Sequence, residues 1–100
     1  MTELEVCRLS AEAINPDRLR YEPDRELVWD WLNMKPWNPR TDAEQRWECV
    51  EWLLKRGLKI ELVRGGAWIE KPDFIYSTRR PASEFPACAV AELHKRSKDG

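Results

Sequence analysis

The sequence is poor in the features that mark several large classes of protein. No run of about 20 apolar residues occurs, so we expect no membrane-spanning helix. The first ten residues, MTELEVCRLS, lack the basic and apolar regions of a secretory signal. The three cysteines, Cys7, Cys49 and Cys88, are odd in number and widely spaced. They predict reduced thiols in a cytoplasmic protein and no disulfide framework.

An excess of positive charge is also absent. Seventeen Lys and Arg residues face 18 Asp and Glu residues, and charged residues make up 35% of the chain. General nucleic-acid binders normally carry more Lys and Arg than this, so the balance disfavours that class. The length of 100 residues predicts one domain that can bury a core without metals or disulfides.

Catalytic and metal-binding groups are sparse. The cysteines and His94 have no CxxC or CxxH spacing that would indicate a zinc site. His94 is the only histidine, and no serine or cysteine has an evident base and orienting group. Gly65 and Gly66 precede no helix N-terminus, so they favour a hairpin over a phosphate-binding loop. We therefore expect no cofactor, no metal and no enzymatic activity.

The clearest elements lie in residues 41–62. Thr41 and Glu44 form a capping-box pattern that predicts a helix from Asp42, and Gly57 is suited to end it in a left-handed conformation. Helical spacing predicts a core-facing stripe on this helix, made of Ala43, Trp47, Val50 and Leu54 with Leu53 on its edge. After the glycine, apolar and polar residues alternate as in a strand with one buried face: Leu58, Ile60 and Leu62 against Lys59 and Glu61.

Further elements flank this unit. Thr2 and Glu5 favour a helix near the N-terminus, although Leu4 and Val6 also fit a short strand. Pro23 opens a second candidate helix over residues 24–34, whose expected buried stripe is Leu27, Trp31 and Met34 with Val28 and Leu32 beside them. Two prolines make residues 35–40 a stiff linker. The glycine turn leads into strands over residues 67–71 and 74–78, with a turn at Pro72 and Asp73. Ser83 is expected to cap a last helix whose buried stripe is Phe85, Ala89, Val90 and Leu93.

The hairpin register and the domain limits follow from these elements. Pairing Arg64 with Ala67 places Leu62 opposite Ile69, and it also sets Glu61 against Glu70. The predicted fold is a single α+β domain in which helices cover a three-stranded antiparallel meander, in the order helix, helix, three strands, helix. We expect an N-terminal extension at residues 1–22, the α+β domain at 23–96 and a flexible tail at 97–100.

Three segments of the chain resemble a known family. They are PDRELVWDWL, then PWNPRTDAEQRWECVEWLLKRG with KIELV and a Gly-Gly turn, and PASEFPACAVAELHKR. Over residues 23–96 they are similar to the small tailed-phage and prophage proteins called the bacteriophage ABA sandwich domain. The resemblance implies a phage or prophage origin and a helix-sheet-helix fold, and it implies no established activity.

The central helix carries the strongest surface signal. Glu44, Glu48 and Glu51, here called the acidic ridge, lie along one flank, where like charges each cost roughly a few tenths of a kcal/mol. Trp52 projects beside this ridge, and Trp68 lies on the outer face of the predicted sheet. Tryptophan next to carboxylates is typical of a protein-binding site. The alternative is that other segments cover Trp52 and that the glutamates are a solvated face.

Nucleic-acid binding is a second hypothesis. Helix, three strands and helix is also the order of double-stranded RNA-binding domains, whose last helix begins with lysines that hold phosphates. Here that helix begins SEFP, with a carboxylate in the same place, so nucleic acid is disfavoured. The residues that would carry this function are Arg64, Arg79, Arg80, His94, Lys95 and Arg96.

The function expected from the sequence is protein binding. We expect a non-enzymatic phage or prophage accessory protein that binds a host protein in the bacterial cytoplasm, such as an inhibitor of a defence system of the anti-CRISPR type. No membrane association is expected. Exposed tryptophans, of which the six in this chain could supply several, would also favour a homodimer. The sequence leaves open which of Trp29, Trp37, Trp52 and Trp68 are exposed.

Overall fold

The computed structural model describes residues 2–64, 66–71 and 74–99. Helices and strands alternate along these residues in groups: one helix, three strands, one helix, three strands and one helix. Their bounds are α1 (Glu3–Ile14), β1 (Leu19–Glu22), β2 (Leu27–Asp30), β3 (Lys35–Pro36), α2 (Ala43–Lys55), β4 (Lys59–Val63), β5 (Gly66–Lys71), β6 (Phe74–Thr78) and α3 (Phe85–Asp99). None of the helices in the described residues is long and apolar enough to cross a membrane.

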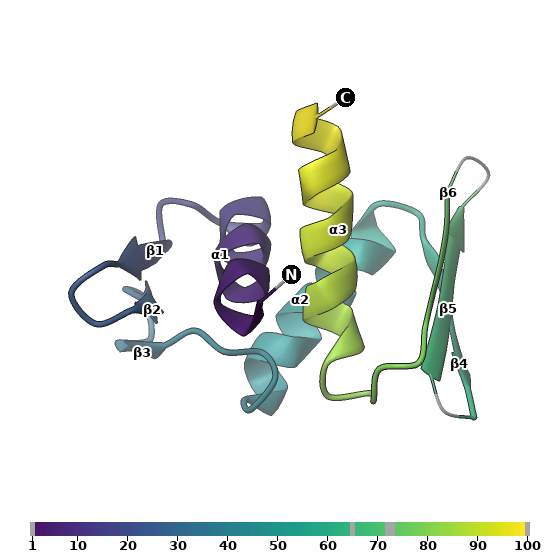
Figure 1. Cartoon of the computed structure of the whole chain (residues 1–100), viewed down its shortest axis with the longest axis horizontal. Helices are drawn as coiled ribbons and strands as arrows, with labels where there is room; N and C mark the ends of the chain where they lie inside the picture. Colours follow the sequence, from purple (N-terminus) through teal and green to yellow (C-terminus); the bar gives the residue numbers. More distant parts are fainter. Residues whose placement is uncertain (1, 65, 72–73, 100) are drawn as a thin grey trace.

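The helices form a layer between two small antiparallel sheets. One sheet has the strand order β1-β2-β3 and the other the order β4-β5-β6, and they lie at opposite ends of the molecule (Figure 1). The predicted class is confirmed, because the fold is α+β and contains a three-stranded antiparallel meander next to helices. The helix-sheet-helix layering implied by the resemblance differs from this arrangement, in which the helices are in the middle.

The core is built around the first half of α3. Ala87, Ala89 and Ala91 are at most 4% exposed, together with Val90 between them. Alanine side chains are small, so they let neighbouring elements approach α3 from several sides at native packing density. Because α1 adds Val6, Cys7 and Ala11 to the same core, residues 3–14 belong to one packed unit with the rest of the chain.

The helix expected over residues 24–34 is wrong, because this segment forms β2 and the turns on either side of it. The β1–β2 and β2–β3 connections each span four residues. Each ends in a non-glycine residue with positive φ, Glu26 at 53° and Met34 at 55°. Glycine or asparagine usually marks such positions, so the sequence carried no turn signal there. The expected order therefore lacks the whole β1-β2-β3 sheet.

Residues 35–40 are also more than a linker. Lys35 and Pro36 form β3 on the edge of the sheet, where a proline costs no ladder hydrogen bond. The next residue, Trp37, is 1% exposed, and its indole Nε1 donates to Ser10 Oγ over 3.3 Å. This segment therefore ties the first sheet to α1.

The helix α2 begins one residue later than expected and buries a different face. Its N-cap is Asp42, whose carboxylate accepts a hydrogen bond from the Gln45 backbone over 3.1 Å. The buried side chains are Gln45, Cys49 and Leu53, whereas the expected core residues Trp47 and Leu54 are 56% and 49% exposed.

A buried polar residue explains that error. Gln45 donates to the carbonyl of Pro36 over 2.8 Å and accepts from the backbone N–H of Asn38 over 2.6 Å. These bonds satisfy the amide group, so it can be buried at little cost. A prediction based on apolar residues places glutamine on the solvent side. It therefore assigned the wrong face of α2 to the core.

The β4–β5 register differs from the expected one, because each residue of β4 pairs with a β5 residue two positions earlier than expected. Val63 pairs with Gly66, Glu61 with Trp68, and Lys59 with Glu70. This register replaces the expected repulsion between Glu61 and Glu70 by an attractive cross-strand pair of lysine and glutamate. The expected turns at Gly65 and at Pro72 and Asp73 lie outside the described residues.

Gly57 provides a direct test of local backbone strain. Its φ is 77°, as predicted for the residue that ends α2, and a Cβ there would meet no atom within 4 Å. Gly57→Ala is therefore expected to cost about 1 to 2 kcal/mol of unfolding free energy through backbone strain alone. Chemical denaturation measures the change. Gly57→Asn should retain part of the stability because asparagine tolerates this conformation, and equal stability of all three proteins would contradict the argument.

Candidate protein-binding site

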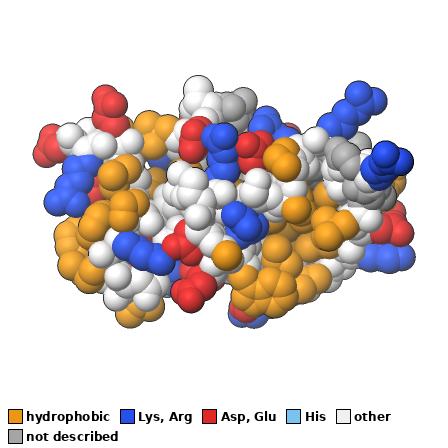
Figure 2. Space-filling view, turned by 90° about the horizontal axis from the view of Figure 1, so that it is seen from below, with side chains coloured by type: hydrophobic (Ala, Val, Ile, Leu, Met, Phe, Trp, Pro, Cys, Tyr) orange, Lys and Arg blue, Asp and Glu red, His pale blue; other side chains and the backbone are white. Residues whose placement is uncertain are grey.

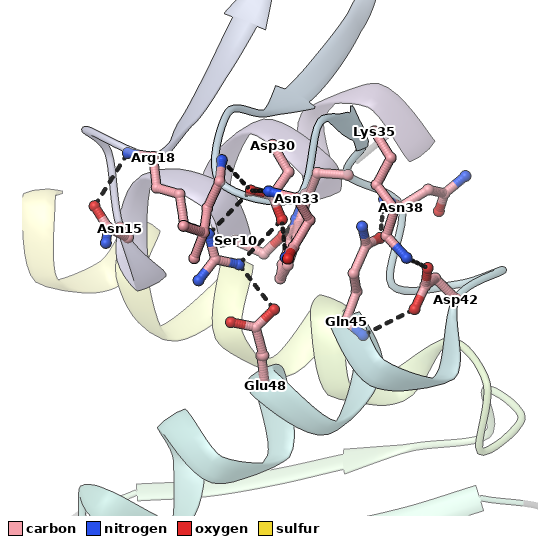
Figure 3. A network of polar contacts seen from close by, with 12 residues as sticks. Ser10, Asn15, Arg18, Asp30, Asn33, Lys35, Asn38, Asp42, Gln45 and Glu48 are labelled. Atoms are coloured by element: carbon pink, nitrogen blue, oxygen red, sulfur yellow. Dashed lines mark hydrogen bonds and ion pairs between the residues drawn. The ribbon is translucent and has the colours of Figure 1, made fainter.

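A buried carboxylate holds the turn between β2 and β3. The side chain of Asp30, the last residue of β2, is fully buried. It accepts hydrogen bonds from the backbone N–H groups of Leu32 and Asn33 over 3.0 and 3.2 Å. It also accepts from the Asn33 side-chain amide over 2.9 Å. Three donors of one turn thus converge on one carboxylate (Figure 3), which fixes the backbone of the turn.

Arg18 joins this carboxylate to α2. Its guanidinium makes a two-point contact with Asp30, with Nε at 3.2 Å and Nη2 at 3.3 Å from the two oxygens. Nη2 also lies 2.8 Å from Glu48 Oε2 on α2. Figure 3 shows the guanidinium between the two carboxylates. A bidentate, charge-assisted contact of this kind is among the stronger hydrogen-bond arrangements in proteins.

The environment of Asp30 keeps its carboxylate ionised. Burial acts to raise its pKa, but hydrogen bonds from Asn33 and Leu32 and the charge of Arg18 act in the other direction and leave the pKa lowered. In the same cluster, the pKa of Arg18 is raised, first by its hydrogen bond to Glu48. The network therefore carries permanent charge at neutral pH.

The turn presents apolar side chains to solvent. Trp31 is 50% exposed, Leu32 70% and Met34 60%, and we call these three residues the apolar turn. The backbone N–H of Trp31 donates to the Arg18 carbonyl over 2.9 Å, and its ring meets the half-buried Trp29 edge to face, with centroids 6.4 Å apart. The three exposed apolar side chains thus lie on a turn whose backbone is held by the buried Asp30 carboxylate.

The acidic ridge is divided by the structure. Glu48 is used internally, because it pairs with Arg18. Glu44 is exposed and Glu51 is half-buried. The like-charge cost expected along the ridge is thus relieved at its centre by an arginine from outside α2. A binding role for these three residues stays a prediction.

Trp52 and Trp68 have different surroundings. Trp52 is half-buried and packs against the core, its Nε1 donates to the Ala13 carbonyl over 3.1 Å, and the Arg56 guanidinium lies 3.5 Å from its ring centroid. It therefore joins α2 to α1. Trp68 is 37% exposed, and its Nε1 donates to Glu70 two residues along the same strand face over 3.1 Å.

The basic residues of the nucleic-acid hypothesis come from distant parts of the fold. Arg64 follows β4 at one end of the second sheet, whereas Lys95 and Arg96 lie in the C-terminal half of α3, toward the opposite side of the molecule (Figure 1). Arg80 lies near Glu84, with 3.8 Å between the charged groups, and Arg96 pairs with Glu92. Arg79 is exposed. Arg64 and Arg79 follow β4 and β6 at the same end of the second sheet, but Lys95 and Arg96 lie elsewhere, so the structure does not bring the whole set into one patch.

The three cysteines are free, buried thiols. Burial, followed by the charge of Glu3, raises the pKa of Cys7 to about 11, and burial raises the pKa values of Cys49 and Cys88 as well. Thiols are the poorly reactive form of cysteine. Within the described residues, no three His, Cys, Asp or Glu side chains are grouped so that they could hold a metal ion.

No family model, no curated protein and no solved structure matches this chain. The resemblance to the bacteriophage ABA sandwich domain therefore stays a prediction.

Sequence reasoning missed the apolar turn. An aspartate followed two and three residues later by backbone donors is a typical Asx turn, and Asp30 with Asn33 has the composition of one. That signal was outweighed by the helical spacing of Leu27, Trp31 and Met34. Placing Asp30 at a strand end would have moved all three apolar side chains of the turn to the surface.

Proposed function

We propose that this protein is a non-enzymatic protein-binding module whose contact site is the apolar turn. The observation that carries the proposal is the combination of exposure and rigidity. Trp31, Leu32 and Met34 are at least half exposed, and the turn that bears them is held by the fully buried Asp30. Binding sites pay less ordering entropy when their contact residues are already held in place.

The chemistry of the turn defines the partner surface. A tryptophan and two flexible aliphatic side chains on an exposed turn fit an apolar pocket in another protein, since a few desolvated aromatic and aliphatic side chains carry most of the energy of such contacts. Methionine can adapt to an irregular pocket wall because its chain is unbranched. The partner is therefore a protein with a concave apolar site.

The narrower hypothesis is a phage or prophage protein that binds a host defence protein, of the anti-CRISPR type. It is supported by the resemblance of residues 23–96 to the bacteriophage ABA sandwich domain. Buried free thiols support a reducing compartment such as the bacterial cytoplasm. Nucleic-acid binding stays a prediction that the balanced charge of the chain disfavours.

The proposal is tested by replacing Trp31 and Leu32 together with serine. We expect a captured host protein to bind at least about 30-fold more weakly, because loss of central apolar contacts typically costs about 2 kcal/mol. Affinity is measured by calorimetry with the captured protein after purification. Thermal unfolding checks that the variant stays folded, as expected for exposed side chains.

Trp47→Ser is the matched control, because Trp47 is also about half exposed, at 56%, but lies on α2. It should leave the affinity within about twofold of the wild type. If the control loses the partner and the serine pair at positions 31 and 32 keeps it, the contact site is α2 and the proposal is wrong.

A further inference from the structure

The helix α2 has a second apolar face that no part of the described chain covers well. Trp47 is 56% and Leu54 49% exposed. Leu54 is seven positions after Trp47, so the two side chains lie on one side of the helix about two turns apart. Val50 between them is half-buried and Ala43 at the start is exposed. We call these four residues the outer stripe. The solvent side of a surface helix normally carries polar residues.

The outer stripe lies within a larger hydrophobic area. Leu62 on β4 is 66% exposed, and it pairs with the buried Ala67, so it stands on the sheet face that is turned to the helices. Figure 2 shows hydrophobic side chains gathered over α2 and toward the second sheet, apart from those at the β1-β2-β3 end. The two hydrophobic areas are thus separate surfaces.

Along one flank of the outer stripe, the charged residues change from acidic at the start of α2 to basic at its end. At 100° per residue, Glu44, Glu51 and Lys55 fall within about 40° of one another on this flank. The acidic Glu44 is at the start of α2 and the basic Lys55 is at its end, and both are exposed. A helix with this order is complementary to itself when a second helix runs in the opposite direction.

We propose that the outer stripe binds a second copy of this chain, with the two α2 helices antiparallel about a twofold axis near residues 50 and 51. In a twofold interface, each contact between a residue of one copy and a residue of the other occurs twice. This axis sets Trp47 of one copy against Leu54 of the other. It also sets Glu44 within about two residues, or 3 Å along the helix axis, of Lys55 on the same flank of the second copy.

Glu51 supplies a constraint that is specific to this arrangement. It lies close to the twofold axis on the charged flank, so it faces Glu51 of the second copy. Like charges directly opposite each other are unfavourable, which limits the strength of the dimer. The attractive pair of Glu44 with Lys55 and the repulsive pair of Glu51 with Glu51 both follow from the twofold symmetry. Binding of a different protein to the outer stripe does not require either pair.

This dimer does not depend on the proposed function. It uses α2, whereas the apolar turn lies beyond β2 at the end of the molecule that carries the first sheet (Figure 1). Failure of one proposal therefore leaves the other standing, and serine at positions 31 and 32 should not change the dimer.

Sedimentation equilibrium over a range of concentrations tests the dimer. The full-length protein should show a concentration-dependent monomer–dimer equilibrium. Glu44→Lys alone and Lys55→Glu alone should each raise the dimer Kd about tenfold, because each turns two symmetry-related attractions into repulsions. The double variant Glu44→Lys with Lys55→Glu should return to within about twofold of the wild type. Glu51→Gln should lower Kd several-fold.

The double variant Trp47→Ser with Leu54→Ser should be a monomer. The side chains replaced in all of these variants are exposed or half-buried, so circular dichroism should show that each variant is folded. A wild-type protein that remains monomeric at the highest concentration overturns the inference. So does a double charge exchange that dimerises no better than the two single variants, because a parallel or heterologous contact gives no such rescue.

Discussion

Replacing Asp30 with alanine is expected to lower the free energy of unfolding by about 3 to 5 kcal/mol, which is the typical cost of removing one partner of a buried ion pair. The change leaves the Arg18 guanidinium, whose side chain is only 16% exposed, without one of its two carboxylates. It also removes the acceptor for three donors of the β2–β3 turn. Guanidinium or urea denaturation followed by circular dichroism measures the loss.

Two comparisons separate these contributions. Asp24→Ala removes an exposed aspartate from the β1–β2 turn and should change stability by less than about 0.5 kcal/mol. Asp30→Asn keeps an acceptor for part of the turn but removes the charge, so its stability should lie between wild type and alanine. A loss below about 1 kcal/mol in the alanine variant would show that the turn is held by other contacts.

The same carboxylate makes stability depend on pH. Because the pKa of Asp30 is lowered on folding, its ionised form stabilises the native state at every pH above the unfolded value of about 4. That contribution is lost as the pH falls through the lower, folded value. We expect the wild type to lose more stability than Asp30→Asn between neutral pH and acid, and parallel curves for the two proteins would contradict this assignment.

The second large effect is expected at Trp37. Its side chain is 1% exposed and lies within the core shared by α1 and the first sheet. Trp37→Ala is expected to cost about 3 to 5 kcal/mol, because a buried cavity of tryptophan size cannot collapse fully. Since small domains have only about 5 to 15 kcal/mol of stability in total, this variant should unfold well below the wild-type melting temperature. Differential scanning calorimetry provides the measurement.

Two controls identify the origin of that loss. Trp47→Ala removes the same side chain from an exposed position, and dilute samples, in which any dimer is dissociated, should melt within a few degrees of the wild type. Ser10→Ala leaves the Trp37 indole N–H without its partner and should cost about 1 to 3 kcal/mol. A Trp37→Ala protein as stable as the wild type would mean that this segment is not part of the cooperative core.

The apolar turn and the outer stripe arise from the same kind of local ambiguity. Leu27, Trp31 and Met34 match a helical period and are also compatible with a strand followed by a turn. On α2, apolar spacing favoured Trp47 and Leu54, while the buried face contains Gln45 and Cys49. Both candidate surfaces therefore consist of residues that sequence patterns assigned to the core.

The sequence by itself determined the features that depend on neighbours a few residues away. The Thr2 cap of α1, the end of α2 at Gly57 and the alternation that makes β4 a strand are of this kind, because capping bonds and backbone preferences act within about one turn. The α+β class follows from these elements.

Only the tertiary structure decided which face of α2 is buried and that residues 31–34 form an exposed turn. The burial of Gln45 depends on backbone groups of residues 36 and 38, and that of Asp30 depends on Arg18, twelve positions earlier. A polar side chain can enter a core only when distant partners satisfy its hydrogen bonds. Those partners meet only after the chain has folded, so the sequence alone could not place the apolar turn or the outer stripe on the surface.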